Sequence, residues 1–140
     1  MTMPVVYTAN ATAEGAGRQG KGYTDDERLT VDLSVPKGMG GDDGPGTNPE
    51  QLFAIGYAAC FHGALKNVVR QAGADAAQSS VHAEVSVIKS DGFGLAVKLV
   101  ASLPGLDQAQ ATELVEKAHQ VCPYSKATRG NIEVEVSATV

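Results

Sequence analysis

The sequence predicts an α+β protein with antiparallel sheets, because its segments follow the order β-β-α-β-β-α-β. Strands are indicated where apolar and polar residues alternate, over 29–35, 81–87 and 132–140. Helices are indicated where apolar side chains recur at helical spacing, most clearly over 48–71. A length of 140 residues and an apolar fraction of 43% are typical of a single domain, 1–140, with a real core.

The N-terminal part is predicted to hold two strands within glycine-rich sequence. Residues 5–11 are apolar and then alternating, which indicates the first strand, and 29–35 form the second, which Pro36 ends. Between them, EGAGRQGKG is predicted to be a turn or a flexible loop. KGMGGDDGPGT is also predicted to be a mobile loop, because it lacks the sequence context of a phosphate-binding loop.

The first helix has clear start signals. Asn48 can cap it, Pro49 suits the first helical position, and Gln51 stands where a capping box places its side chain. The helix dipole favours the negative charge of Glu50 in the first turn. We expect the helix to run to about Gln71, where the sequence AGAD stops it.

The C-terminal part is predicted to begin with a β-hairpin. Its strands cover 81–87 and 95–99, and SDGFG between them is typical of a tight turn. A proline–glycine pair then breaks the chain before the second helix, 107–120. The alternating IEVEVSATV is expected to close the fold as a strand.

Composition and charge exclude several classes of partner. The net charge of −5 argues against nucleic acid and anionic membranes, which favour basic surfaces. The longest apolar stretch is interrupted by Gly56, His62 and Gly63 before it meets Lys66, which predicts that it is too short to span a bilayer. The N-terminus lacks the features of a signal peptide, so we expect a cytoplasmic protein. In a reducing compartment the two cysteines would be free thiols, a catalytic pair or metal ligands.

The helix over 48–71 has two different faces, since successive helical residues advance by about 100°. The members of the bulky face, which should press on a sheet, are Tyr57, Phe61, Leu65, Val68 and Val69. The members of the small face, which lets another backbone or a ligand come close, are Gly56, Cys60, Gly63 and Asn67. A cysteine on such a face is most often a small hydrophobe, so Cys60 alone does not indicate a functional thiol.

Glu50 adds a carboxylate to this helix, but about 15 Å separates it from Cys60 along a straight axis. These two side chains of one helix therefore cannot meet. If two copies of the helix pair antiparallel about a two-fold axis, Glu50 of one chain reaches Cys60 of the other, and the small face makes such pairing possible. Analytical ultracentrifugation tests this hypothesis, which a compact active monomer would exclude.

Two residues outside this helix are further candidates. Cys122 precedes Pro123 and is a natural N-cap of a short helical turn, where the helix dipole acidifies a thiol. The alternative is a chance cysteine at the end of the second helix. Arg18 lies in GAGRQG, whose glycines let the backbone bring a guanidinium into a crowded site. A lone arginine in such a loop is usually solvated, and spacing does not decide between the two interpretations.

Metal and hydrolase sites are weaker alternatives. Zinc needs several ligands, and the candidate side chains do not cluster at ligand spacings. Those candidates are Cys60, His62, His82, His119 and Cys122. A cysteine hydrolase needs a base beside its nucleophile, but Cys60 and His62 point about 200° apart on one helix. We therefore expect no metal and no cofactor, and a non-catalytic module that binds small molecules or senses thiol redox state is the alternative to an enzyme.

Two long motifs resemble those of a known family. NPEQLFAIGYAACFHGAL and VCPYSKATRGN strongly resemble the two signature segments of the organic hydroperoxide resistance (Ohr) proteins, within the OsmC superfamily. GPGTNPEQLF and NIEVEVSA fit as well, so the resemblance covers nearly the whole chain. GAGRQG is looser than the glycine-glycine-arginine turn of the family, and Lys126 stands where an asparagine is common. The sister OsmC branch is less well matched by the VCPYSKATRG segment.

The resemblance implies an OsmC/Ohr-like fold, an intertwined homodimer with two active sites at its interface, and reduction of organic hydroperoxides by two cysteines. Cys60 matches the peroxidatic position and Cys122 the resolving position, while Arg18 and Glu50 match the activating pair. The family is typically reduced again by lipoylated proteins rather than by thioredoxin or glutathione.

Elementary chemistry explains why such residues belong together. A free thiol is only a few per cent ionised at neutral pH, and burial makes ionisation harder. One guanidinium at about 4 Å contributes on the order of 4 kcal/mol at an effective dielectric near 20, so Arg18 suffices, and Glu50 would hold and aim it. The residues of the apolar lining that we expect to favour alkyl hydroperoxides are Phe53, Tyr57, Phe61 and Met39.

Overall fold

The computed structural model describes residues 3–140 and falls into two compact units, Met1–Pro49 and Glu50–Val140. The helix that carries Cys60 belongs to the second unit, together with all of the chain that follows it. The expectation of one domain over 1–140 stays a prediction.

The first unit contains a small antiparallel sheet with the order β1-β2-β3. Its strands are β1 (Ala11–Glu14), β2 (Lys21–Thr24) and β3 (Thr30–Asp32). The expected strand over 5–11 is wrong, because the first strand begins only at its last residue, and the strand expected over 29–35 is much shorter. β2 forms within and just after a segment expected to be a loop. Pairing with β1 and β3 stabilises this strand although it contains a glycine, which is uncommon in strands.

The long helix α1 (Pro49–Gln71) confirms the sequence-based boundaries. It begins at the proline, whose missing N–H needs no partner in the first turn. It ends two residues before Gly73, which adopts a positive φ of 75°. The buried side chains of α1 are Tyr57, Phe61, Leu65, Val68 and Val69, the five that the helical spacing placed on the bulky face.

The second unit is built on a hairpin of two ten-residue strands, β4 (Ser80–Lys89) and β5 (Phe93–Ser102). They pair antiparallel from end to end, which confirms the expected hairpin. In the turn, both Asp91 (φ 53°) and Gly92 (φ 91°) lie in the left-handed region. Tight hairpin turns with this backbone suit the right-handed twist of the flanking strands.

The last strand, β6 (Glu133–Thr139), corrects the expectation of an antiparallel sheet, because it pairs parallel to β5. Two helices connect the strands, α2 (Gln108–Val121) and the short α3 (Pro123–Thr128). A strand that returns through a helical crossover on the same sheet runs parallel to its neighbour.

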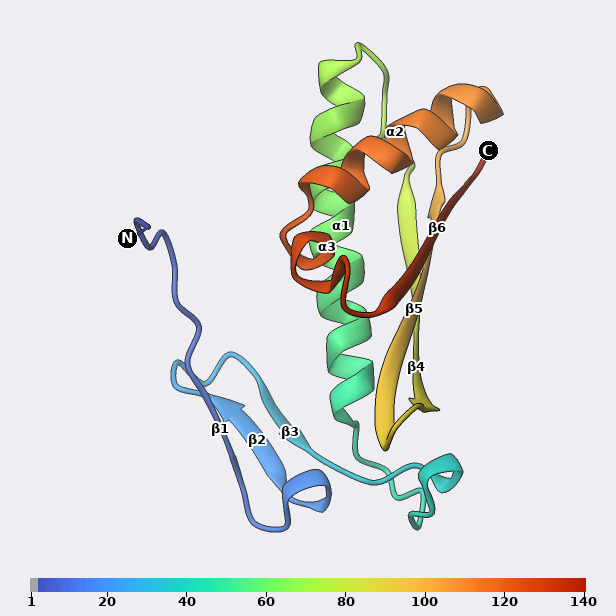
Figure 1. Ribbon diagram of the computed structural model, residues 1–140. Coiled ribbons are helices and arrows are strands. Elements are labelled where there is room, and N and C mark those ends of the chain that lie inside the picture. The colour runs from blue at the N-terminus through green and yellow to red at the C-terminus, as the bar shows by residue number, and fades with distance from the viewer. Residues whose placement is uncertain (1–2) are drawn as a thin grey trace. The chain divides into compact units, whose positions relative to one another are not determined.

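The hydrophobic core of the second unit lies between one face of this sheet and the helices, and Figure 1 shows α1 beside the three strands with α2 and α3 next to it. Alternate residues of β4, β5 and β6 face the core and the others face outward, as the strand pattern requires. The largest fully buried side chains are Tyr57, Phe61, Leu65, Leu99, Leu103, Val69, Val115, Cys122 and Ser125.

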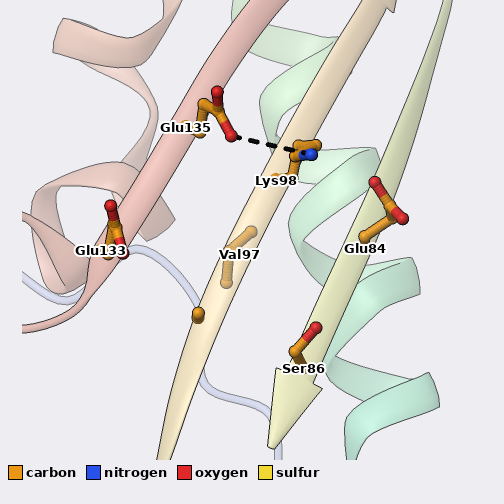
Figure 2. Close-up of a pocket in the computed structure, with 7 residues that line it drawn as sticks. Glu84, Ser86, Val97, Lys98, Glu133 and Glu135 are labelled. Carbon is orange, nitrogen blue, oxygen red and sulfur yellow. Dashed lines mark ion pairs between the residues drawn. The ribbon is translucent and has the colours of Figure 1, made fainter. Parts of the chain in front are cut away.

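The outer face of the sheet is polar and carries a shallow hollow. Figure 2 shows side chains of β4, β5 and β6 there, with an ion pair of 3.8 Å between Lys98 and Glu135. Both partners are more than half exposed, so this pair contributes little to stability. The residues lining the hollow are Glu84, Ser86, Ala96, Val97, Lys98, Glu133 and Glu135. None of them is a thiol, so the candidate redox site lies elsewhere.

α1 is long enough and apolar enough to cross a membrane, with a mean hydropathy of 1.3. The expectation that this stretch is too short to span a bilayer is therefore wrong. This is weak evidence for a membrane span, because a core helix of a globular protein meets the same criteria. Its bulky face is already packed into the core of the second unit.

Candidate functional site: a pair of thiols

The two cysteines lie together in the second unit, although 62 positions separate them in the sequence. The Sγ atoms of Cys60 and Cys122 are 3.8 Å apart, with the Cys122 thiol as the donor. Both cysteines are free thiols, Cys122 fully buried and Cys60 partly accessible. Because a disulfide needs about 2 Å between the sulfurs, a small movement of the side chains is enough to join them. The sequence-based expectation that the two sulfurs meet is confirmed.

Cys122 is held at the junction of two helices. It ends α2, where its backbone N–H donates to the carbonyl of Ala118 at 2.9 Å. Cys122 is also the N-cap of α3, and its carbonyl accepts a hydrogen bond from Lys126 N–H at 2.9 Å. Pro123 follows it at the first helical position. The predicted N-cap is therefore confirmed, and the backbone on both sides of this thiol is fixed.

The environment of Cys60 in this unit opposes its ionisation. Burial raises the pKa of the Cys60 thiol above its ordinary value, and the neighbouring Cys122 sulfur raises it further. A hydrogen bond from the backbone N–H of Tyr124 acts in the opposite direction and lowers the pKa. A nearby positive charge, or further hydrogen-bond donors, would lower the pKa of Cys60 and favour the thiolate.

The small face of α1 is in part covered by α3 of the same chain. A Cβ atom on Gly56 would lie 3.3 Å from the hydroxyl oxygen of Tyr124. The Tyr124 ring also stacks on Phe53, with centroids 6.1 Å apart, and meets Tyr57 at 5.7 Å. The close approach that the small face predicted is thus made by an aromatic ring one helical turn from Cys60.

The four residues expected to line a substrate pocket lie in different surroundings. Tyr57 and Phe61 are fully buried in the core, and Phe53 is half-buried against it. Met39 is half-buried in the first unit, in a short 3-10 turn, Lys37–Met39. Their contact with substrate stays a prediction.

The two expected activating residues belong to different units. Arg18 lies in the 3-10 turn Gly17–Gln19 of the first unit. Glycine is required before and after it, because Gly17 has a φ of 60° and a Cβ on Gly20 would clash with the backbone oxygen of Glu14. Glu50 lies in the first turn of α1. The roles of both residues stay predictions.

A polar network beside the thiols was not identified from the sequence. The Tyr57 hydroxyl contacts Ser125 Oγ at 2.8 Å and Thr128 Oγ1 at 3.1 Å, and His119 Nδ1 contacts Ser125 Oγ at 2.7 Å. Its only signal in the sequence is spacing, since His119 and Ser125 stand three positions before and after Cys122. Whether residues at this spacing form a network depends on contacts between segments that are distant in the sequence.

The other polar side chains near the helices show no metal-binding geometry. Within residues 3–140, no group of three or more His, Cys, Asp and Glu side chains could hold a metal ion. His62 instead contacts Ser79 Oγ through Nε2 at 2.9 Å, which ties α1 to the segment that follows it. Burial lowers the pKa of His62, and Lys66 lowers it further.

The fold and the thiol pair define the class of protein. The family model described as OsmC-like protein matches residues 40–137, the segment that contains both cysteines. A solved structure of an organic hydroperoxide resistance protein OsmC from Legionella pneumophila superposes with a TM-score of 0.90 at 46% identity, covering 98% of this chain and 100% of that chain.

More specific relatives are organic hydroperoxide resistance proteins. The one from Xanthomonas axonopodis pv. citri is 50% identical over 140 residues, covering 95% of this chain and 94% of that protein. A Vibrio cholerae protein with captopril bound in one of its active sites is 48% identical with a TM-score of 0.89, covering 99% and 95% of the two chains. This chain therefore belongs to the OsmC/Ohr family of organic hydroperoxide resistance proteins.

Proposed function

We propose that the protein is a thiol-dependent peroxidase that reduces organic hydroperoxides to alcohols. The observation that carries this proposal is the pair of free sulfurs 3.8 Å apart, one partly accessible and one buried. An accessible thiol can be oxidised by substrate, and a buried thiol beside it can then complete a disulfide. Membership of the family supports the choice of organic hydroperoxide as the oxidant.

The first step is attack of the Cys60 thiolate on the outer oxygen of the hydroperoxide. The O–O bond breaks, the leaving alkoxide takes up a proton to become the alcohol, and Cys60 becomes a sulfenic acid. The Cys122 thiol then attacks this sulfur, which releases water and forms the Cys60–Cys122 disulfide. An external dithiol reduces the disulfide by exchange, returns both thiols and is itself oxidised to a disulfide.

Activation of Cys60 is assigned to Arg18, with Glu50 as the residue that holds and aims it. The raised pKa of the Cys60 thiol supports a role for a cation, because the neutral thiol is a poor nucleophile. A guanidinium close to the sulfur stabilises the thiolate, and a carboxylate paired with that guanidinium fixes its direction. Glu50 alone would repel the thiolate, so we infer that it acts through the arginine.

We infer that the working molecule is a homodimer with active sites at its interface. Apolar side chains that are exposed in the single chain support it, since Ile55 on α1 is 70% exposed and Val6 and Tyr7 are 101% and 79% exposed. Such surfaces are typical of protein–protein contacts. The Vibrio cholerae relative has more than one active site, as a symmetric oligomer would.

We infer that the substrate is an alkyl or lipid hydroperoxide, bound by an apolar lining to which Phe53, Tyr57, Phe61 and Met39 contribute. A lining of this kind favours a long alkyl group over hydrogen peroxide, because it removes apolar surface from water.

We also infer that the protein works in the cytoplasm and that a lipoylated protein supplies the dithiol.

A steady-state assay of reductants tests this function. Alkyl hydroperoxide is supplied with dihydrolipoamide, thioredoxin or glutathione, and the consumption of peroxide is followed. Dihydrolipoamide is expected to support multiple turnovers and to surpass the other two. Absence of turnover with every dithiol, in protein whose two thiols are intact, would contradict the proposed function.

A further inference from the structure

Four side chains form a continuous polar network between the helices that carry the thiols. Ser125 Oγ on α3 is contacted by the Tyr57 hydroxyl of α1 at 2.8 Å and by His119 Nδ1 of α2 at 2.7 Å. The Tyr57 hydroxyl also contacts Thr128 Oγ1 at 3.1 Å. Tyr57 and Ser125 are both 0% exposed, so these groups depend on one another for hydrogen bonds.

The network is anchored one helical turn from each sulfur. Tyr57 stands three residues before Cys60 on α1, and Ser125 stands three residues after Cys122 on α3. Residues three apart are neighbours on the surface of a helix. The hydrogen bond between Tyr57 and Ser125 therefore runs beside the contact between Cys60 and Cys122 and ties the same two helices together.

The directions of the hydrogen bonds follow from a count of hydrogens. Thr128 Oγ1 donates to the carbonyl of Ser125 at 3.2 Å, which makes four contacts for the three hydroxyl hydrogens of Tyr57, Ser125 and Thr128. With one hydrogen for each contact, the fourth must come from His119 Nδ1–H. His119 then donates to Ser125, Ser125 donates to Tyr57, Tyr57 donates to Thr128, and Thr128 donates to the backbone carbonyl of Ser125.

A neutral imidazole agrees with this arrangement. Burial lowers the pKa of His119, and the positive charge of Arg129 lowers it further, against a smaller opposite effect of Glu116. Arg129 also donates to the carbonyl of His119 at 2.6 Å, which holds the end of α2 in place. Protonation on Nδ1 leaves Nε2 with its lone pair.

We propose that this network positions Cys122 for disulfide formation, with His119 protonated on Nδ1 as its first donor and with Ser125, Tyr57 and Thr128 passing the hydrogen bonds on. The inference rests on the proposed peroxidase function. The step that it promotes is attack of the Cys122 thiol on the Cys60 sulfenic acid, in which an S–S bond forms, the S–O bond breaks and water leaves.

The short α3 explains why such a device is needed. A helix of six residues has little stability of its own, so the position of its N-terminal cysteine depends on tertiary contacts. A fully paired buried network permits one arrangement of its members, because any other leaves a polar group without a partner. Holding the second sulfur next to the first makes disulfide formation faster than a further oxidation of Cys60.

The test measures how the sulfenic acid is partitioned. Tyr57→Phe keeps the buried ring and Ser125→Ala removes one hydroxyl, while Ser137→Ala, at an exposed position on β6, is the matched control. Each reduced protein is mixed with excess cumene hydroperoxide, free thiols are alkylated, and disulfide and Cys60 sulfinic acid are measured by mass spectrometry. We expect about tenfold more sulfinic acid relative to disulfide in Tyr57→Phe and Ser125→Ala, with the first oxidation of Cys60 unchanged in Ser125→Ala.

The outcomes separate this inference from the proposed function. A wild-type partition in both variants, with a normal disulfide in the control, overturns the inference and leaves the peroxidase intact. Wild-type protein that forms no disulfide overturns both. Independently of variant folding, nitrogen NMR of the wild-type protein is expected to show His119 as the Nδ1–H tautomer, with the signal assigned by its loss in His119→Gln. An Nε2–H tautomer would overturn the proposed direction of the network.

Discussion

At the scale of single residues, opposing influences act on the pKa of Cys60. Burial and the second sulfur raise the pKa of the thiol, and the backbone N–H of Tyr124 lowers it. A thiol that stays protonated attacks a peroxide slowly, because the thiolate is the nucleophile. In the proposed mechanism, the guanidinium of Arg18 lowers the pKa of Cys60 and so favours the thiolate.

The proposed roles of the two sulfurs predict different defects. Cys60→Ser is expected to abolish turnover, since no other thiol of the chain is accessible to substrate. Cys122→Ser should still consume one equivalent of hydroperoxide per chain but recycle poorly, because no disulfide can form within the chain. Single-turnover and steady-state assays distinguish the two, and a Cys60→Ser protein that turns over alkyl hydroperoxide would end this mechanism.

Removal of the proposed cation predicts a change in pH dependence. In Arg18→Gln the raised pKa of Cys60 is no longer opposed, so the thiolate forms only at higher pH and the rate near neutrality falls. The profile of peroxide consumption against pH should move to higher pH, while Arg18→Lys keeps a charge and moves it less. Identical profiles for the wild-type and Arg18→Gln proteins would show that the arginine does not act on this thiol.

At the scale of elements, the contact between α1 and α3 is the part of the fold that creates the site. Gly56 allows the Tyr124 ring to lie against α1, and that residue supplies the backbone N–H that lowers the pKa of Cys60. Tyr124 is 39% exposed, so its side chain can move slightly toward solvent. A larger group at Gly56 cannot be accommodated in this way.

Two substitutions at Gly56 are expected to differ in effect. Gly56→Ala needs a shift of a few tenths of an ångström by Tyr124 and gains roughly 1 kcal/mol of helix propensity, so the free energy of unfolding should stay constant or rise. Gly56→Leu should displace Tyr124 and slow the oxidation of Cys60. Denaturant unfolding and peroxide kinetics measure both, and normal kinetics in Gly56→Leu would refute the role given to this packing.

The elements that depend on local sequence were predicted well. α1 has a proline at its first position, and its buried side chains follow the helical period, so both its bounds and its core face were correct. The hairpin of β4 and β5 was marked by its turn residues. β2 and the parallel direction of β6 were not predicted, because both depend on pairing with neighbours that alternation alone does not reveal.

The candidate site also contains features that the sequence predicted and features that it did not. The two cysteines stood in long motifs, so their meeting could be expected, and their separation of 3.8 Å agrees. The network of Tyr57, Ser125 and His119 joins positions up to 68 residues apart, and serine, tyrosine and histidine are too common for such a set to be selected from one sequence. Only the packing of α1, α2 and α3 together brings them into contact.

At the scale of the whole molecule, the proposed dimer gives a reason for the exposed apolar residues. Ile55 on α1 and Ile88 on β4 are the same residue type, 70% and 40% exposed in the single chain. The first lies on the helix that carries Cys60, and the second on the polar outer face of the sheet. A dimer built on α1 would bury only the first.

This difference predicts two outcomes for one kind of substitution. Ile55→Glu should weaken the dimer and reduce peroxide turnover with it, because a charge would be buried in the interface. Ile88→Glu is the matched control and should leave both unchanged. Analytical ultracentrifugation measures the association, and an Ile55→Glu protein that remains a fully active dimer would exclude an interface at this surface.

The most direct test of the central claim is a thiol count during one exposure to peroxide. Reduced protein is mixed with one equivalent of cumene hydroperoxide or of hydrogen peroxide, and free thiols, the alcohol and the Cys60–Cys122 disulfide are measured over time. The redox couple predicts loss of both thiols for each alcohol formed, faster with cumene hydroperoxide than with hydrogen peroxide. Intact thiols after the hydroperoxide has been consumed would contradict it.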